Sequence, residues 1–460
     1  MSSNLVDGSA LAALVDALPT GAVLVDPDRM AGYRWDRAAD PDAGLPLAVA
    51  RVSSTAEIQQ VLRFATEHTV PVVPRGAGTG LSGGSSAIDG CIVISTERMR
   101  EIEVDPVTRT VRVQPGALNA EVKAAAAEHG LWYPPDPSSF EICSIGGNLA
   151  TNAGGLCCVK YGVTTDYVLG MTVVLADGTA VQLGGARLKD VAGLSLTKLF
   201  VGSEGILGVI SEALLRLLPA QRPPATVVAT FSALDHATAA VLDITRRLRP
   251  AMLEFMDRVT INAVEDVTSM GLDRTAEALL LIQSDESTEA AAAEAAAIER
   301  ICTANSATET FLTDDPAVGE QFVVARRMAI PAVERRGSLL LEDVGVPLPR
   351  LGDLVRGIAA IAAERDVEIA VIAHAGDGNT HPLIVTDRTD ADQCARAQTA
   401  YGQIMDLAIA LGGTITGEHG VGRLKKPWLH SYLGPDTHLL TQRIKDALDP
   451  AGILNPGAVL

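Results

Sequence analysis

Five glycines lie within the eleven residues 74–84, and this loop constrains the fold more than any other part of the chain. Three of them have the Gly-x-Gly-x-x-Gly spacing of a dinucleotide-binding motif, which should open a helix within a βαβ unit. Here the loop leads through residues 85–90 to the strand-like run 91–95, so we reject that interpretation. Because glycine permits positive φ and close backbone approach, consecutive N–H groups can converge on a diphosphate. A plain glycine-rich turn is the alternative.

Two further segments combine glycine with small polar residues. Residues 134–155 contain three prolines, four glycines and several Ser and Asn side chains, and residues 202–210 read Gly-Ser-Glu-Gly-Ile-Leu-Gly-Val-Ile. Three such segments in one region are hard to explain as turns alone. Residues 142–159 carry no charge, but their polar and glycine content indicates a loop-rich site rather than a lipid-facing helix.

The pattern of strand-like and helical segments predicts an α+β protein with two main regions. Short apolar strands alternate with glycine-rich turns from about residue 45, and Ser54 with Glu57 has the spacing of a capping box that begins a helix. A proline-rich linker at 219–224 precedes a second region of alternating strand and helix patterns. We expect an N-terminal segment 1–44, a first domain 45–220, a second domain 221–415 and a C-terminal segment 416–460 that returns to complete the active site.

Composition narrows the possible partners and the compartment. The chain has 37 Lys and Arg against 56 Asp and Glu, a net charge of −19, which argues against nucleic acid and anionic membranes as partners. None of its six cysteines form a Cys-x-x-Cys pair, and the N-terminus has no basic flank before an apolar run. We therefore expect a reduced, cytoplasmic protein with no transmembrane segment.

Three polar residues in two unusual segments suggest a metal site. His374 and His381 flank a Gly-Asp-Gly-Asn turn between two strand-like runs, so the turn can bring both imidazoles to one place. Glu418, within Gly-Glu-His-Gly, would complete a set of two histidines and one carboxylate, which suits zinc or another divalent transition metal. The alternative is that these are loop residues with satisfied hydrogen bonds.

The glycine-rich and histidine segments together closely resemble flavoproteins of the vanillyl-alcohol-oxidase type, in the branch of D-lactate dehydrogenase, glycolate oxidase and D-2-hydroxyglutarate dehydrogenase. The matching motifs are Pro-Arg-Gly-x-Gly-Thr-Gly-Leu-Ser-Gly-Gly, Thr-Asn-Ala-Gly-Gly, Gly-Ser-Glu-Gly-x-Leu-Gly, His-Ala-Gly-Asp-Gly-Asn-x-His and Gly-Glu-His-Gly-x-Gly. The resemblance runs from about residue 45 to the C-terminus. It implies a two-part PCMH-type FAD-binding domain, an α+β substrate (cap) domain, and a C-terminal segment that returns to the FAD domain.

The resemblance implies FAD, with its diphosphate on the 76–82 loop and its isoalloxazine near residues 136–152. No histidine lies in the glycine loops, so we expect the flavin to be bound non-covalently. The cofactor-binding residues implied are Arg75, Gly76, Gly78, Thr79, Gly80, Leu81, Ser82, Pro135, Asp136, Ser139, Gly146, Gly147, Asn148, Asn152, Gly154, Glu204, Gly205, Ile210 and Asn455. The chain departs from the family at Ala458, where a lysine is usual.

The same resemblance implies that His374, His381 and Glu418 bind Zn²⁺ or Mn²⁺, and that His419 is the catalytic base. A divalent metal lowers the pKa of a bound hydroxyl, and a neutral histidine, with an ordinary pKa of about 6.5, can take its proton. Hydride would then pass from carbon 2 of a 2-hydroxy acid to the flavin. Arg326 matches the family's substrate-carboxylate arginine, although a solvated helix face is the alternative for Arg326 and its neighbour Arg327.

Residues 339–344 bear on the substrate. Members that oxidise D-2-hydroxyglutarate carry a lysine in this stretch, and none is present here. The sequence therefore favours a D-2-hydroxy acid of the D-lactate or glycolate type, with D-2-hydroxyglutarate as an alternative. We expect an electron acceptor such as a quinone, an electron-transferring flavoprotein or a cytochrome. A metallohydrolase and a non-catalytic FAD subunit of a larger complex are the alternatives from other classes.

Overall fold

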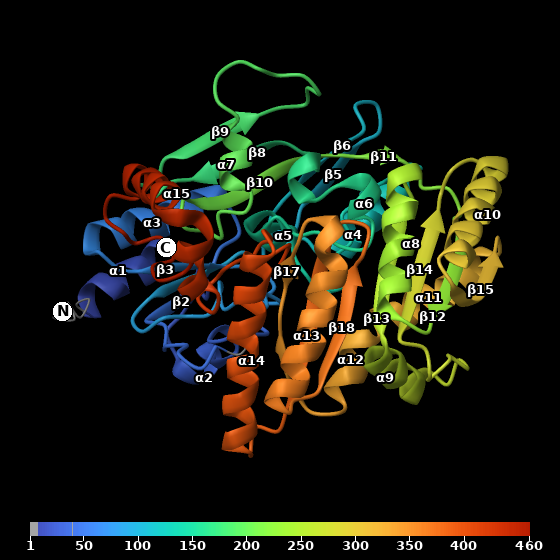
Figure 1. The fold of residues 1–460 in the computed structure, drawn as a ribbon. Helices are drawn as coiled ribbons and strands as arrows, with labels where there is room; N and C mark the ends of the chain where they lie inside the picture. The colour runs from blue at the N-terminus through green and yellow to red at the C-terminus, as the bar shows by residue number, and fades with distance from the viewer. Residues whose placement is uncertain (1–7, 39) are drawn as a thin grey trace. The chain divides into compact units, whose positions relative to one another are not determined.

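The computed structural model describes residues 8–38 and 40–460, and the chain divides into two compact units (Figure 1). Unit 1 comprises Met1–Ala153, Val163–Ala220 and Glu418–Leu460, and unit 2 comprises Gly154–Gly162 and Gln221–Gly417. The C-terminal segment therefore returns to the first unit, within an α+β protein. The short segment Gly154–Gly162 belongs to unit 2, which no sequence pattern indicated. The N-terminal residues that bear on a leader sequence lie outside the described part.

Unit 1 begins with a four-stranded sheet of order β1-β2-β4-β3, in which β4 pairs in parallel with both β2 and β3. The predicted helix starts at Ser54, whose hydroxyl accepts from the N–H of Glu57, and its buried face packs on this sheet. The elements are α1 (Gly8–Ala17), β1 (Val23–Leu24), α2 (Pro27–Met30), η1 (Ala31–Tyr33), β2 (Ala48–Arg51), α3 (Thr55–His68), β3 (Val72–Arg75) and β4 (Ile92–Ser95).

The rest of unit 1 centres on an antiparallel five-stranded sheet of order β5-β6-β10-β8-β9. Strand β10 alternates buried and partly exposed residues, as expected for a sheet with one face in the core. The elements are β5 (Ile102–Asp105), β6 (Thr110–Val113), α4 (Asn119–Ala127), β7 (Leu131–Trp132), α5 (Ile145–Thr151), η2 (Thr164–Tyr167), β8 (Val168–Val174), β9 (Ala180–Gly184), α7 (Leu196–Phe200), β10 (Val209–Arg216), β11 (Leu218–Pro219) and α15 (Lys426–Leu448).

The C-terminal segment is anchored in the core of unit 1. Leu454 bridges in parallel to Val72 at the start of β3, and Ile453 and Leu454 are buried with the strands of the first sheet. At the end of α15, the ammonium group of Lys445 pairs with Asp449 and donates to the carbonyls of Ile206 and Leu454. These contacts hold the chain end against the body of unit 1.

Unit 2 is built on one large antiparallel sheet of order β15-β12-β14-β13-β18-β19-β16, with β17 also paired to β19. Strands β12, β14, β13, β18 and β19 are almost wholly buried because helices cover both faces. The strands are β12 (Ala225–Phe231), β13 (Met252–Asp257), β14 (Ala278–Ser284), β15 (Ala307–Thr313), β16 (Ser338–Leu341), β17 (Val344–Gly345), β18 (Ile369–His374) and β19 (Asn379–Thr386).

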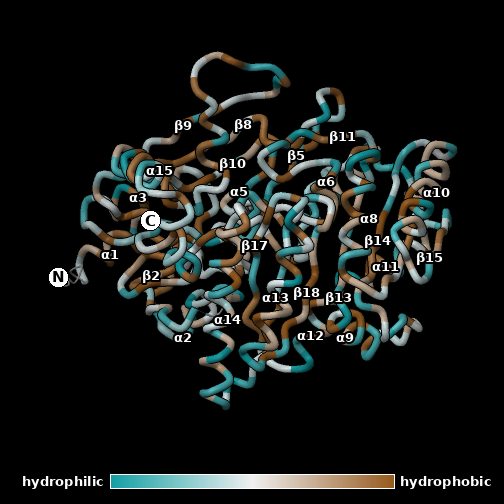
Figure 2. The backbone as a smooth tube through the Cα atoms, viewed as in Figure 1, coloured by the Kyte–Doolittle hydropathy of each residue, from teal (hydrophilic) through white to brown (hydrophobic). Residues whose placement is uncertain are grey.

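The helices of unit 2 form two layers. Helices α8, α10, α13 and α14 contact one face of the sheet, and α9, α11 and α12 contact the other. The hydrophobic run of β18 is evident in Figure 2. The helices are α6 (Cys158–Tyr161), α8 (Leu234–Arg247), α9 (Arg258–Thr268), α10 (Thr288–Ala304), α11 (Pro316–Arg327), α12 (Ala329–Glu334), η3 (Leu348–Arg350), α13 (Leu351–Arg365) and α14 (Ala391–Ala410).

The uncharged stretch 142–159, predicted to be a loop-rich site rather than a lipid-facing helix, contains two short helices. Residues 145–151 form α5, which begins at the N-cap Ser144 and ends at Asn152 in the left-handed conformation, and α6 begins at Cys158. The two glycines at the start of α5 concealed the helix, because glycine has low helix propensity. Within the described residues, no helix is long and apolar enough to cross a membrane.

Candidate active site

The glycine loop of unit 1 is closely packed against the start of α5. The hydroxyl of Ser144 accepts hydrogen bonds from the N–H groups of Ala77 and Gly147, at 3.1 and 3.4 Å. A Cβ atom added at Gly76 would collide with this hydroxyl, and Gly78 has φ +74°. Glycine is required at these two positions because Ser144 and Arg75 pack closely against the loop. The resulting backbone cradle is of the kind expected for a diphosphate.

The C-terminal segment closes around the other end of this loop. The Ser82 hydroxyl donates to the carbonyl of His419 at 3.1 Å, and the Ser82 carbonyl accepts from the N–H groups of Arg423 and Leu424. The Arg423 guanidinium donates to the Gly83 carbonyl at 2.7 Å. Gly422, at φ +53°, passes so close to Ser82 that a Cβ would not fit. His419 is thereby held beside the glycine loop within unit 1.

Glu204, which the resemblance assigned to the cofactor, ties the third glycine segment to the C-terminal one. Its carboxylate accepts from the N–H groups of Val421 and Gly422 at 2.7 and 2.8 Å. Burial raises the pKa of Glu204 to about 7, opposed by these hydrogen bonds and the nearby cations. The described hydrogen bonds of its carboxylate are thus with protein backbone.

Asn455 and Arg75 are also engaged by the protein. The Asn455 amide nitrogen donates to the carbonyls of Gly84 and Glu204, and its oxygen accepts from Arg423. The Arg75 guanidinium lies within bonding distance of the Ser85 and Gly32 carbonyls, and burial lowers its pKa. Both residues therefore organise the walls of the loop.

The remaining predicted cofactor residues lie mostly around α5. Asn148 is buried on α5 and its side-chain oxygen accepts from Asn119, while Asn152 ends the helix and accepts from the N–H of Thr165. Asp136 is buried in the preceding loop. The others in unit 1 lie on three segments: Thr79, Gly80 and Leu81 on the glycine loop, Pro135, Ser139, Gly146 and Gly147 before and within α5, and Gly205 and Ile210 beside Glu204. Gly154 falls in unit 2.

In unit 2, the two predicted histidines come together. His374 ends β18, and His381 lies inside β19 rather than before it. Because Ile372 pairs with His381 across the two strands, both side chains point to the face covered by α9, α11 and α12. Their ring centroids are 5.2 Å apart, and each side chain is about 5% exposed.

A buried carboxylate that the sequence did not reveal lies beside His374. Glu254, on β13, has one carboxylate oxygen 2.8 Å from His374 Nδ1 and the other 2.8 Å from Arg326 Nη2. Arg326 is only 2% exposed, so the alternative of a solvated helix face is wrong for this residue. Glu254 falls within an apolar strand, Met-Leu-Glu-Phe-Met, and a charged residue at such a position was the available signal.

Asp343 is a second acidic residue that sequence reasoning missed. Its carboxylate accepts from the N–H of Gly417 at 3.0 Å and from the Thr416 hydroxyl at 2.6 Å. Its Oδ1 lies 3.8 Å from His381 Nδ1. Asp343 therefore fixes, within unit 2, the chain that runs directly into Glu418 and also faces the second histidine.

Glu418 and His419 are consecutive residues at the start of the C-terminal part of unit 1. His419 Nε2 lies 3.6 Å from Glu418 Oε1, and both side chains are partly buried. Glycines flank the pair on both sides, and Gly420 has φ +84°. The two side chains are thus held close together, as a base beside a metal ligand would require.

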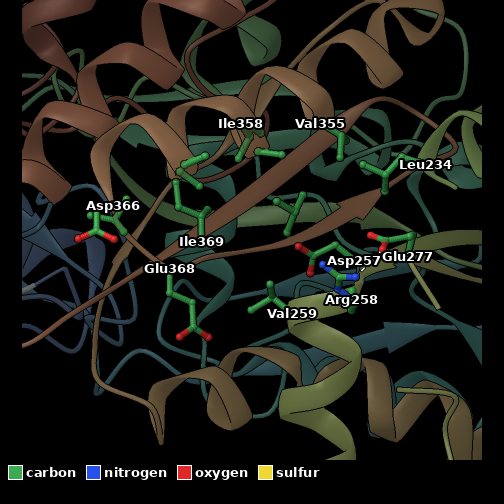
Figure 3. Close-up of a pocket in the computed structure, with 15 residues that line it drawn as sticks. Leu234, Asp257, Arg258, Val259, Glu277, Val355, Ile358, Asp366, Glu368 and Ile369 are labelled. Atoms are coloured by element: carbon green, nitrogen blue, oxygen red, sulfur yellow. Dashed lines mark hydrogen bonds and ion pairs between the residues drawn. The ribbon is translucent and has the colours of Figure 1, made fainter. Parts of the chain in front are cut away.

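A separate cavity of about 480 Å³ lies elsewhere in unit 2 (Figure 3). It is at the opposite end of β18 from His374, where Ile369 and Val371 face α13 and the first turn of α9. Figure 3 shows Val355 and Ile358 on one wall, with Arg258 and Glu368 across from them. None of the predicted site residues lines this cavity, so it is distinct from the histidine pair.

Comparison with known sequences identifies the class of protein as an FAD-linked oxidoreductase. Residues 46–184 match a sequence model described as an FAD binding domain, and residues 220–459 match FAD linked oxidases, C-terminal domain. The chain belongs to this family of FAD-linked oxidases.

Curated relatives support this assignment. The chain is 43% identical over 418 residues to the glycolate oxidase subunit GlcD of Bacillus subtilis, covering 90% of this chain and 88% of the relative. It is 35% identical over 437 residues to a D-lactate dehydrogenase of Archaeoglobus fulgidus, covering 93% and 95%.

Solved structures share the fold. A substrate-bound p-cresol methylhydroxylase matches with a TM-score of 0.82 at 16% identity, covering 100% of this chain and 98% of that one. A 4-ethylphenol oxidase from Gulosibacter chungangensis matches with a TM-score of 0.82 at 17% identity, covering 98% and 96%. The PCMH-type architecture expected from the sequence is thereby confirmed.

Proposed function

We propose that this protein oxidises a D-2-hydroxy acid of the D-lactate or glycolate type to the 2-oxo acid, using non-covalently bound FAD and one divalent metal ion. The observation that carries the proposal is the pair of histidines, His374 and His381, each with its Nδ1 towards a buried carboxylate. Relatives named for glycolate oxidation and D-lactate dehydrogenation support the substrate class.

The residues of unit 1 fit FAD. The glycine loop lets the backbone fold tightly against Ser144 and Arg75, and a glycine-rich backbone of this kind can approach a diphosphate closely. When bound, FAD supplies the two-electron acceptor for hydride from carbon 2 of the substrate. Glu204 and Asn455 hold the glycine segments around the cofactor through their backbone contacts.

The donor set fits a divalent transition metal such as Zn²⁺ or Mn²⁺. Two imidazoles and one carboxylate leave positions open for the substrate, and a metal ion there would acidify the substrate hydroxyl. Glu418 is the third ligand in this proposal. Glu418 directly follows Gly417, whose N–H donates a hydrogen bond to Asp343. Asp343 lies between β16 and β17, in the same sheet as the strands that carry both histidines.

His419 acts as the base. Its Nε2 is the ring nitrogen on the side of Glu418, at 3.6 Å from Oε1, and is therefore placed to take the hydroxyl proton of a substrate bound next to that carboxylate. The Ser82 hydroxyl, which binds the His419 carbonyl, restrains the base beside the glycine loop. Arg326 supplies positive charge for the substrate carboxylate, balanced by Glu254.

We also propose that the protein has no binding site for a second carboxylate of the substrate. The stretch beyond Arg326 continues through β16 to Glu342 and Asp343, both fully buried. Two acidic residues there do not favour a second substrate carboxylate, which agrees with a short monocarboxylic 2-hydroxy acid. Electrons then pass from the reduced protein to an acceptor such as a quinone, an electron-transferring flavoprotein or a cytochrome.

A His419→Ala variant tests the assignment of the base. It should retain FAD and metal at wild-type stoichiometry, yet lose at least 10²-fold in the rate of flavin reduction in anaerobic stopped-flow experiments, in line with the usual contribution of a general base. His129→Ala, at an exposed histidine, is the matched control and should reduce at the wild-type rate. Rapid reduction by the His419 variant would remove this residue from its role.

A further inference from the structure

Glu254 is the residue of unit 2 whose burial most needs explanation. It lies in the middle of β13, its side chain is 1% exposed, and its nearest strand neighbours are apolar. An ionised carboxylate in such a place is costly unless it is paired on its polar atoms. Here each oxygen has a partner at 2.8 Å, His374 Nδ1 on one side and Arg326 Nη2 on the other.

The contact with His374 determines which ring nitrogen faces outwards. A carboxylate oxygen accepts hydrogen bonds, and the second oxygen of Glu254 lies 2.8 Å from Arg326 Nη2. The ring nitrogen facing Glu254 is therefore the one that donates a hydrogen bond, so that Nε2 is the ring nitrogen with which His374 would bind a metal ion. A partner of this kind orients a metal-binding histidine and raises its basicity.

The contact with Arg326 has a separate consequence. Arg326 comes from α11, whereas His374 comes from β18, so one carboxylate joins two elements that carry different parts of the proposed site. The register shows why this is possible: Phe255 pairs with Ala373, so Glu254 and His374 lie at adjacent positions with side chains on the α11 face. The guanidinium of Arg326 thus forms an ion pair, through Nη2, with the same carboxylate that contacts the imidazole.

We propose that Glu254 is a positioning residue that sets the metal-binding form of His374 and the orientation of Arg326 at once, so that metal affinity and substrate-carboxylate affinity depend on the same side chain. This inference rests on the proposed function, because it takes His374 as a metal ligand and Arg326 as the carboxylate partner. It adds to the proposed site a carboxylate that contacts His374 and Arg326.

The first test measures Zn²⁺ and Mn²⁺ affinity of the FAD-loaded protein by titration calorimetry, without substrate. Glu254→Gln preserves shape but offers an amide hydrogen to one of its two neighbours, and should raise the Kd for metal 10- to 100-fold. Glu265→Gln is the matched control, because Glu265 is another buried carboxylate of unit 2 that binds only the N–H groups of Gly271 and Leu272 among its described hydrogen bonds. A Kd for Glu254→Gln within twofold of wild type overturns the proposal.

The second test separates the two contacts kinetically. At saturating metal, kcat of Glu254→Gln should return to within about threefold of wild type, whereas KM for the hydroxy acid should stay raised by about tenfold, because added metal cannot reorient Arg326. Full recovery of both constants would show that Glu254 acts on the metal alone. If Glu254→Gln does not fold, Glu254→Asp takes its place, since the shorter side chain keeps the charge but cannot reach both neighbours.

A third measurement does not depend on metal or activity. In metal-free protein labelled with ¹⁵N-histidine, the His374 resonances, identified by their loss in His374→Gln, should show hydrogen on Nδ1 and none on Nε2. Hydrogen on Nε2 overturns the inference even if the protein oxidises hydroxy acids. Conversely, the expected pattern in a wild-type protein that binds no divalent metal would uphold the positioning by Glu254 and refute the proposed metal site.

Discussion

The hydroxyl of Ser82 donates a hydrogen bond of 3.1 Å to the carbonyl oxygen of His419, which joins the glycine loop to the C-terminal segment across 337 positions of sequence. This bond fixes the backbone of the proposed base relative to the proposed cofactor cradle, within a single unit. Ser82→Ala should therefore slow flavin reduction roughly 3- to 10-fold, as expected for one lost neutral hydrogen bond. Anaerobic stopped-flow measures the rate. FAD content should be unchanged, and an unaltered rate would show that the bond does not position His419.

A substitution at Gly76 tests whether the glycine loop binds the diphosphate of FAD. Gly76→Ala would bring a methyl group against the Ser144 hydroxyl, which holds the loop to the start of α5. The purified variant should contain less than a tenth of the wild-type FAD per chain by absorbance. Gly32→Ala is the control, because a Cβ there meets nothing within 4 Å. Normal FAD content in Gly76→Ala would contradict the assignment of this loop.

The raised pKa of Glu204 predicts that the free energy of unfolding depends on pH. Burial raises its pKa from an ordinary 4.5 to about 7, so the folded protein binds a proton more tightly than the unfolded chain. The tighter proton binding therefore stabilises the folded protein fully below about pH 4.5. This stabilisation, at most about 3 kcal/mol in the free energy of unfolding, is lost as pH rises through 7. Wild type should therefore lose stability relative to Glu204→Gln between pH 5 and 8 in chemical denaturation. A difference that is constant or grows with pH would contradict this.

Lys445 and Asp449 anchor the chain end, and their pair is buried. Lys445→Met leaves the Asp449 carboxylate buried without its cation and should lower the free energy of unfolding by about 3 kcal/mol. Arg396→Met breaks a more exposed ion pair with Asp392 and should cost under about 1 kcal/mol. Urea denaturation of both variants measures the contrast, and equal effects would refute the anchoring role.

The sequence predicted the parts of the fold that local chemistry determines. The helix after Ser54, the strands on either side of the histidine turn and the approach of His374 to His381 all follow from capping, periodicity and turn geometry. The metal set and the cofactor residues stay predictions, since neither ligand is present.

Other features depended on long-range packing that no local pattern reveals. Glu254 and Arg326 are 72 positions apart, and their ion pair arises only when α11 packs on the sheet that contains β13. Asp343 meets Gly417 in the same way, through the assembled unit. Helix α5 was missed because its glycines and polar residues serve a close packing contact, which outweighs propensity.

The most direct measurement of the central claim is anaerobic mixing of FAD-loaded, metal-loaded protein with D-lactate, glycolate and L-lactate while flavin absorbance is followed. The account predicts rapid bleaching by D-lactate or glycolate, little by L-lactate, loss of bleaching after removal of metal by a chelator, and recovery on adding Zn²⁺ or Mn²⁺. Absence of bleaching with every D-2-hydroxy acid tried, or bleaching that persists at full rate in verified metal-free protein, would contradict it.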